Sequence, residues 1–194
     1  MYRPRLVGVT ADLEVIVADE TSVLQGIDTR CRGDSRLLMA DRARIAVVGI
    51  GNTLAGDDGV GVVIAERLRR RWPESEEILV ATLPGDLFAV SDLLEYTEAL
   101  LFVDAIAGES PGEIRILNTT QRAFAVSLHQ TDIGTVMSAL RKLEMVDDFP
   151  EWQVWGITIE TPEELGEGLS PVIAEAAELL EAKIIEHVEG ILTT

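Results

Sequence analysis

The sequence predicts an α/β fold, a three-layer sandwich in which a twisted, mostly parallel sheet of about five strands lies between helices on both faces. Short apolar runs, rich in β-branched residues, alternate with segments whose apolar residues recur at helical spacing. The connection from Asp104 to Glu113 is too short for a crossover helix, so one edge strand is expected to be antiparallel. With 194 residues, 47% of them hydrophobic, the chain can bury the core of one domain.

Residues 1–43 are expected to be an extension outside this fold. Residues 6–17 could supply a strand or two, whereas residues 25–36 are polar, charged and typical of a loop. Met39 stands just before the first core strand and is an alternative start of translation. We therefore expect the extension to be weakly packed, or to be a misassigned leader, and the folded domain to span residues 44–194.

A strand, a glycine-rich turn and a helix are predicted within residues 45–71. Residues 45–48 are apolar and three of the four are β-branched, which suits a buried strand, and residues 49–52 interrupt it with types that tolerate unusual backbone angles. Asp57 and Asp58 stand where the helix begins. The simplest interpretation is that Asp57 caps this helix and that Asp58 favours its dipole.

The glycine-rich turn does not match the two common phosphate-binding motifs. A dinucleotide-binding fingerprint would need a third glycine where Leu54 stands, and a P-loop would need Gly-Lys-Ser/Thr, which is absent. Two carboxylates at a helix N-terminus also disfavour a bound anion. The turn is therefore not expected to bind a nucleotide.

The next elements continue the alternation of strand and helix. Residues 78–82 and 99–103 are predicted strands, and the second of them ends at Asp104. Between them, Asp86 can cap a helix that runs through Glu95.

The second half of the chain is predicted to supply two strands and two helices. Residues 113–117 form the antiparallel edge strand, and residues 152–158 form a fifth strand. The first helix starts at Thr131 or Asp132, and the last starts after Ser170, with proline at its first position, and runs to about residue 188. The apolar faces of these two helices are predicted to include Leu143, Val172 and Leu179.

Charge and composition exclude several classes of protein. The net charge is −18, and residues 1–43 carry six basic and seven acidic residues, so nearly all of the excess lies in the predicted domain. Nucleic acid is therefore a poor partner; a cationic partner or metal ions suit this charge, unless acidity serves only solubility. No apolar run has the length of a membrane span, no signal-peptide pattern is present, and Cys31 is the only cysteine. We expect a soluble, cytoplasmic protein with no membrane partner.

Four motifs occur in order between residues 44 and 192. They are Gly49-x-Gly51-Asn52-x-Leu54-x-x-Asp57-Asp58-Gly59-x-Gly61, Phe102-Val-Asp-Ala-Ile106, His129 ahead of a helix, and Gly166-Glu-Gly-Leu-Ser-Pro171. In sequence and in order, they resemble the hydrogenase maturation proteases. These endopeptidases trim the precursor of the nickel-containing large subunit of [NiFe]-hydrogenases.

Three residues from separate motifs can converge at one edge of the sheet. Asp58 follows the first strand, Asp104 ends the third, and His129 lies before the third helix. In such folds, ligands bind beyond the carboxyl ends of parallel strands. Two carboxylates and one imidazole suit a divalent transition metal with open coordination positions. The alternative is structural, because Asp104 can satisfy loop amides and a lone loop histidine often has no role.

The resemblance implies roles for these residues. The family positions that match Asp58, Asp104 and His129 bind metal, and the metal implied is nickel already mounted in the substrate, although zinc or cadmium can occupy such a site. Three further positions fall in regions that the resemblance implies for substrate recognition: Asp86, Gly85 and Asn52. The implied partner is a hydrogenase large-subunit precursor, and the implied state of the protease is a monomer.

The hydrolysis itself can follow more than one route. The sequence shows no Ser-His-Asp arrangement, no Gly-x-Ser-x-Gly and no His-Glu-x-x-His. Two mechanisms remain, metal-assisted hydrolysis and catalysis by a carboxylate general base. Asp58 and Asp104 are the candidate catalytic residues. We expect a nickel-recognising endopeptidase that removes a C-terminal extension from the hydrogenase precursor. The alternatives are a non-catalytic nickel-binding maturation chaperone and a metal-independent, acid-type peptidase that uses Asp58 and Asp104 as a dyad.

Overall fold

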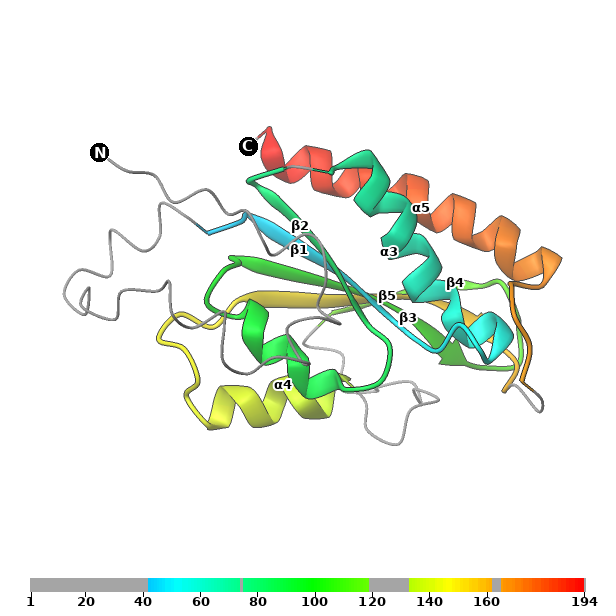
Figure 1. The fold of residues 1–194 in the computed structure, drawn as a ribbon, viewed down its shortest axis with the longest axis horizontal. Coiled ribbons are helices and arrows are strands. Elements are labelled where there is room, and N and C mark those ends of the chain that lie inside the picture. The colour runs from blue at the N-terminus through cyan, green and yellow to red at the C-terminus, as the bar shows by residue number, and fades with distance from the viewer. Residues whose placement is uncertain (1–41, 74, 119–132, 162–164, 194) are drawn as a thin grey trace, which may run out of the picture.

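The computed structural model describes residues 42–73, 75–118, 133–161 and 165–193. These residues form a five-stranded sheet in the order β2-β1-β3-β5-β4 (Figure 1). Neighbouring strands pair in parallel, except that β4 runs antiparallel to β5 at the edge. The mostly parallel sheet and its antiparallel edge strand are therefore confirmed. The strands are β1 (Ile45–Ile50), β2 (Ile78–Leu83), β3 (Ala99–Ala107), β4 (Ile114–Asn118) and β5 (Glu151–Ile159).

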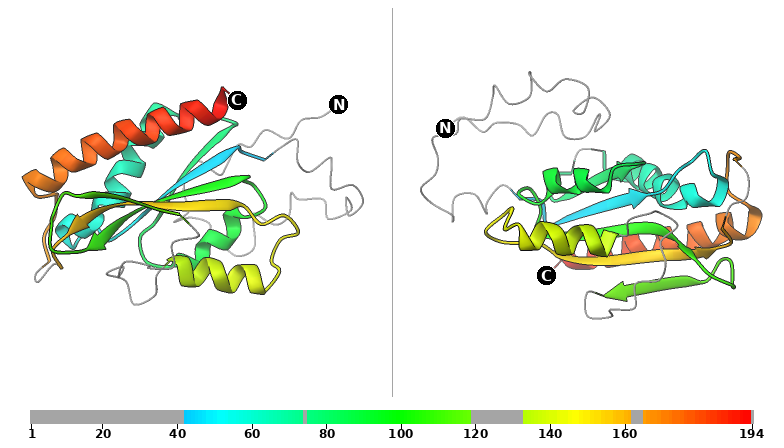
Figure 2. Two further views of the ribbon diagram at one scale, coloured as in Figure 1. Left: turned by 180° about the vertical axis from the view of Figure 1, so that it is seen from behind. Right: turned by 90° about the horizontal axis from the view of Figure 1, so that it is seen from below.

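Helices cover both faces of the sheet and complete the predicted three layers (Figure 1, Figure 2). On one face lie α3 (Val60–Arg71) and α5 (Pro171–Leu192), and on the other lie η3 (Leu87–Leu93) and α4 (Ile133–Lys142). A short 3₁₀-helix, η2 (Gly56–Gly59), leads directly into α3. Within the described residues, no helix is long and apolar enough to cross a membrane.

Each face of the sheet has its own apolar core, because side chains alternate between the two faces along every strand. In β3, Leu101 and Val103 belong to the core beneath α3 and α5, whereas Leu100 and Phe102 belong to the core beneath η3 and α4. A strand that is buried on both faces has a continuous apolar sequence, which is why the strands β1 and β3 could be predicted from the sequence.

Strand β3 extends beyond its predicted end. Its pairing with β5 continues to Ala107↔Ile159, so Asp104 lies inside the strand rather than at its end. The three residues after Asp104 are small or apolar, and the pairing partners in β5 extend equally far. Asp104 is therefore held by the sheet and not by a loop.

Three leucine and valine positions predicted to face the core are exposed instead. Helix α4 ends at Lys142, which leaves Leu143 outside it and 67% exposed. On α5, Val172 and Leu179 are more than half exposed, because this helix contacts the sheet along one stripe only. The stripe consists of Ile173, Ala176, Ala177, Leu180, Ile184 and Val188.

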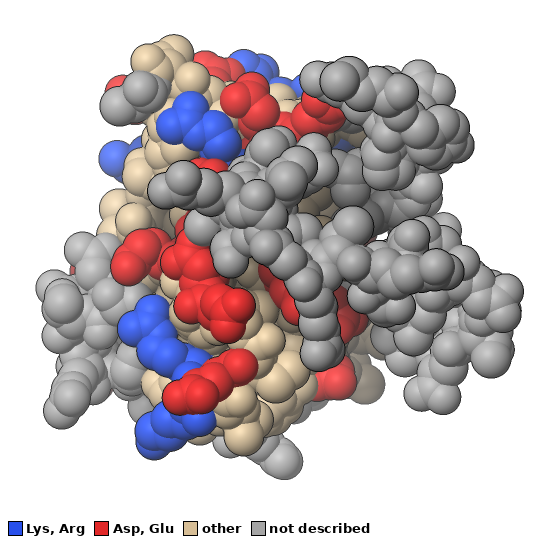
Figure 3. All heavy atoms as spheres, turned by 90° about the vertical axis from the view of Figure 1, so that its left-hand side faces the viewer, with Lys and Arg blue, Asp and Glu red and all other residues tan. Residues whose placement is uncertain are grey.

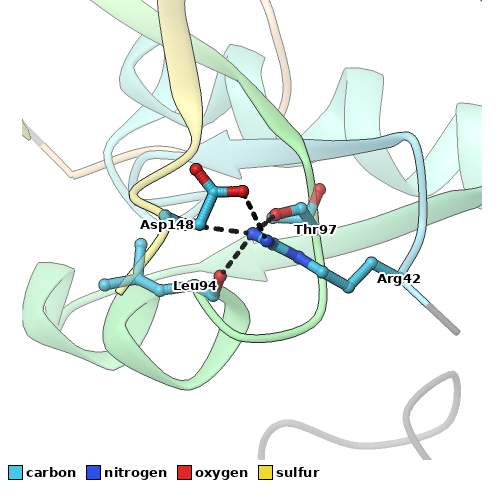
Figure 4. Close-up of polar contacts among 4 residues, drawn as sticks. All are labelled: Arg42, Leu94, Thr97 and Asp148. Carbon is cyan, nitrogen blue, oxygen red and sulfur yellow. Dashed lines mark hydrogen bonds and ion pairs between the residues drawn. The ribbon is translucent and has the colours of Figure 1, made fainter. Parts of the chain in front are cut away.

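Arg42 is the first described residue, and it joins three parts of the domain (Figure 4). Its guanidinium donates hydrogen bonds to the carbonyl oxygens of Leu94, at 3.1 Å, and of Thr97, and pairs with the Asp148 carboxylate at 3.3 Å. The next residue, Ala43, forms a parallel bridge with Thr97. The predictions for residues 1–41, including the strand within residues 6–17 and the start at Met39, lie outside the described residues.

At the end of the molecule where β1, β3 and β5 begin, acidic side chains lie interspersed with Lys and Arg (Figure 3). Exposed acidic residues flank the starts of β3 and β5, and they include Glu95, Glu98, Glu144, Asp147 and Glu151. The opposite end, where the parallel strands finish, carries the candidate site.

Candidate functional site

The candidate site lies where the strand order changes direction. After β1 the chain passes through α3 to β2 on one side, and it then returns through η3 to β3 on the other side of β1. Open α/β sheets bind ligands at such a switch point, beyond the carboxyl ends of the strands. The ends of β1 and β3 are therefore the place at which to look for functional side chains.

The glycines of the first motif let α3 pack closely on these two strands. A β-carbon on Gly61 would overlap the carbonyl oxygens of Ile50 and Val103, and one on Gly49 would overlap the carbonyl oxygen of Gly61. Gly51 has φ +140°, a conformation that side chains rarely adopt. The motif thus brings the start of α3 against the residue that precedes Asp104, and its glycines serve packing rather than phosphate binding.

Asp58 is a buried carboxylate at the end of this turn. It lies in η2 and is only 6% exposed. Its Oδ2 accepts a hydrogen bond from the backbone N–H of Asn52 at 3.0 Å, which directs the carboxylate back over the turn. Aspartate is seldom this buried unless its carboxylate has a partner, as it has here in the Asn52 N–H.

Asp104 is the second buried carboxylate at this edge, 4% exposed. The pairing of β1 with β3 ends at Gly49↔Val103, so Asp104 is the first residue of β3 beyond the end of that pairing. It follows Leu100 and Phe102 on the face toward η3 and α4. Its Oδ1 accepts a hydrogen bond from the backbone N–H of Ala105 at 2.8 Å, which fixes the orientation of the carboxylate.

His129 lies outside the described residues, so the predicted three-residue set is not assembled by the structure. Among the residues that are described, no group of three or more His, Cys, Asp or Glu side chains could hold a metal ion. The chain re-enters the structure at Ile133, which is buried in the core on the same face as Asp104. The other histidine, His187, packs on Trp155 with ring centroids 4.9 Å apart.

The residues predicted to choose the substrate lie at the same end of the sheet. Asp86 follows β2 and caps η3, where its Oδ1 accepts the backbone N–H of Phe88 at 2.9 Å. The predicted helix through Glu95 is thus a shorter 3₁₀-helix that ends at Leu93. Asp86 and the adjacent Gly85 are exposed, and so is Asn52 after β1.

Asp57 does not cap α3, contrary to the simplest interpretation of the sequence. The N-cap of α3 is Gly59, and the Asp57 carboxylate instead accepts the backbone N–H of Ser170 at 2.6 Å. Ser170 belongs to the last motif and precedes α5. The only signal in the sequence that pointed to this contact is that both residues belong to motifs of the resemblance.

Comparisons with known proteins agree with this fold and with these motifs. A model of the hydrogenase maturation protease family matches residues 62–187, more than half of the chain. The hydrogenase 2 maturation protease of Escherichia coli is 34% identical over 123 residues, which are 56% of this chain and 74% of that protein. The hydrogenase expression/formation protein HupD of Bradyrhizobium diazoefficiens is 38% identical over 104 residues, which are 50% of this chain and 53% of HupD. This chain therefore spans about half the length of that relative.

A solved structure shows the same fold. The hydrogenase maturating endopeptidase HybD from E. coli superposes with a TM-score of 0.61 at 27% identity, over 76% of this chain and 93% of that chain. The chain belongs to the hydrogenase maturation protease family, a family of endopeptidases. The resemblance inferred from the four motifs is confirmed.

Proposed function

We propose that this protein is the endopeptidase that removes a C-terminal extension from the precursor of a [NiFe]-hydrogenase large subunit, and that it recognises nickel already mounted in that precursor. The observation that carries the proposal is the pair of buried carboxylates, Asp58 and Asp104, at the switch point of a chain from this family. The nickel belongs to the substrate and not to the protease.

The donor set suits such a nickel ion. Asp58 and Asp104 offer carboxylate oxygens whose orientations are fixed by the backbone N–H groups of Asn52 and Ala105. His129 would add an imidazole nitrogen, a ligand that nickel accepts readily. A site of this kind also accepts zinc or cadmium, so metal binding alone does not identify nickel as the natural ion.

Two routes to hydrolysis fit these residues. The substrate's metal can polarise the scissile carbonyl or lower the pKa of a bound water. Alternatively, Asp58 or Asp104 can act as the general base that removes a proton from the attacking water. Both routes use the same two carboxylates, and both require the scissile bond to lie beyond the ends of β1 and β3.

Recognition of the precursor is assigned to exposed residues beside this site. Asp86 and Gly85 follow β2, Asn52 follows β1, and these strands are neighbours in the sheet. Around Gly85, apart from its own chain neighbours, no described atom lies within 4 Å of the position of an added β-carbon, so a substrate segment can approach the backbone there. We propose further that the protease acts as a monomer in the cytoplasm.

Incubation of the purified protein with the nickel-loaded precursor tests the proposal. The expected product is a shortened large subunit whose mass identifies the cleavage point, and the same precursor prepared without nickel should stay intact. Binding without cleavage would instead support the non-catalytic maturation chaperone. Cleavage of both preparations would support the acid-type peptidase in which Asp58 and Asp104 share a proton.

A further inference from the structure

We infer that Asp57 is a positioning residue, whose carboxylate fixes the glycine-rich turn to the loop before α5 and thereby holds Asp58 in place. The inference rests on the proposed function for its catalytic consequence. Its geometric part, the control of Asp58 by Asp57, concerns only the residues of this chain.

The contact between Asp57 and Ser170 joins two motifs that are 113 residues apart. The Ser170 N–H lies at the N-cap of α5, where an acidic acceptor is favoured both by the hydrogen bond and by the helix dipole. The hydroxyl of Ser170 makes no capping hydrogen bond within the described part of the chain. In a capping box, an acidic residue in the first turn of a helix accepts the backbone N–H of the N-cap residue. Asp57 accepts that N–H in α5, although it belongs to a distant segment.

Two backbone hydrogen bonds reinforce this contact. The N–H of Gly56 donates to the carbonyl oxygen of Gly166 at 2.6 Å, and the N–H of Gly166 donates to that of Leu54 at 2.9 Å. Together they form an isolated parallel bridge between Ala55 and Gly166. The first and last motifs are thus one structural unit, in which Asp57 supplies the side-chain contact.

The same turn determines where the Asp58 carboxylate lies. The backbone N–H of Asn52 donates to the Asp58 carboxylate. The backbone carbonyl oxygen of Asn52 accepts the N–H of Ala55 at 3.0 Å, and its side-chain oxygen accepts the N–H of Leu54 at 3.0 Å. The turn also contains Gly51 and Gly56, both with positive φ, which have wide conformational freedom in the absence of external contacts. An anchor at Asp57 removes that freedom directly beside Asp58.

Position matters here because catalytic groups act within narrow geometric limits. A displacement of about 1 Å can cost on the order of 100-fold in rate. If the anchor is lost, Asp58 should be held less firmly while the sheet beneath it stays intact. The expected signature is a fall in kcat that exceeds the change in KM.

Substitutions on both sides of the hydrogen bond test the inference. Asp57→Ala removes the acceptor, and Ser170→Pro removes the N–H donor, while the φ of −62° at Ser170 already suits proline. Asp57→Asn keeps an oxygen acceptor without the charge, and Ser170→Ala keeps the donor. We expect kcat on the nickel-loaded precursor to fall by about 10- to 100-fold in Asp57→Ala and in Ser170→Pro. In Asp57→Asn it should fall less, and in Ser170→Ala it should stay near the wild-type value. The double variant Asp57→Ala/Ser170→Pro should be no slower than the slower single variant.

Amide hydrogen exchange gives a readout that does not depend on activity. In Asp57→Ala and Ser170→Pro, the Asn52 amide should exchange faster, and the Val48 amide in β1 should not. Unchanged exchange at Asn52 would overturn the inference, and so would equal acceleration at Val48, because that would indicate general destabilisation. If the wild-type protein fails to cut the precursor, the proposed function fails, and the comparison of Asn52 with Val48 still decides whether Asp57 positions Asp58.

Discussion

Asp104 is the residue at which a metal-binding role and a structural role predict opposite results. In Asp104→Asn the side chain keeps its shape and an oxygen that can accept the Ala105 N–H, but it loses its charge. We expect nickel affinity to fall at least about tenfold and the melting temperature to stay unchanged or rise, because repulsion between two buried carboxylates is relieved. Calorimetric titration with Ni²⁺ and melting curves on the same samples measure both effects.

The two histidines provide the matched comparison for that experiment. His129→Ala should also lose nickel binding at little cost in stability, since the sequence places it in a loop. His187→Ala should leave nickel affinity unchanged, because His187 packs on Trp155, whose side chain lies on the face of the sheet opposite Asp104. A lower melting temperature with wild-type nickel affinity in Asp104→Asn would assign Asp104 to the structure alone.

The position of a residue could be predicted from sequence when it follows from topology, but not when it depends on a distant partner. Asp58 and Asp104 were expected at one edge because the carboxyl ends of parallel strands meet there. The structure places Asp58 in η2, after β1, and Asp104 inside β3, at the first residue beyond the pairing with β1. The contact of Asp57 with Ser170 could not be predicted, because local rules equally favour a cap on the adjacent helix.

At the scale of elements, Arg42 holds together η3, β3 and the segment between α4 and β5. Its side chain is 9% exposed, and its guanidinium donates to backbone carbonyls at Leu94 and Thr97, whereas Asp148 is 65% exposed. Arg42→Met keeps much of the packing but leaves those carbonyls without this donor. The expected loss is about 1–3 kcal/mol of unfolding free energy, measured by urea denaturation.

Asp148→Asn is the control for that prediction. It removes the ion pair but keeps the donors to Leu94 and Thr97, and an ion pair with an exposed carboxylate contributes little. A loss in Asp148→Asn as large as that in Arg42→Met would show that the ion pair, and not the carbonyl contacts, stabilises this junction.

The elements themselves were predicted best where burial dictates the pattern. Strands β1 and β3 are covered on both faces and appear as apolar runs, and α5 starts at Pro171 as its sequence indicates. Their ends were predicted less well, because strand β3 continues for as long as β5 offers it a partner. Leu179 was assigned to the core because its own position on α5 does not reveal which stripe meets the sheet.

At the scale of the whole molecule, acidic residues occur at both ends of the sheet, exposed at one end and buried at the other. Exposed acidic residues flank the starts of β3 and β5, whereas the candidate site at the opposite end holds buried carboxylates. The net charge of −18 is therefore not simply the charge of the site. A binding experiment that varies salt would report on the exposed acidic end as well as on Asp58 and Asp104, which is why metal titration is the more direct test.

The boundary of the folded unit can be located by two truncations. Removal of residues 1–38 should leave the fold largely intact, as the composition of that segment indicates, because Arg42 and Ala43 remain. Removal of residues 1–43 also deletes the Arg42 contacts and the two hydrogen bonds, each 2.9 Å long, that Ala43 makes with Tyr96 and Glu98. A loss of roughly 2–3 kcal/mol would lower the melting temperature of a domain of this size by about 5–10 °C. Thermal unfolding of the full chain and both truncations measures the difference, and an equally large drop on removal of residues 1–38 would show that the N-terminal segment is part of the folded domain.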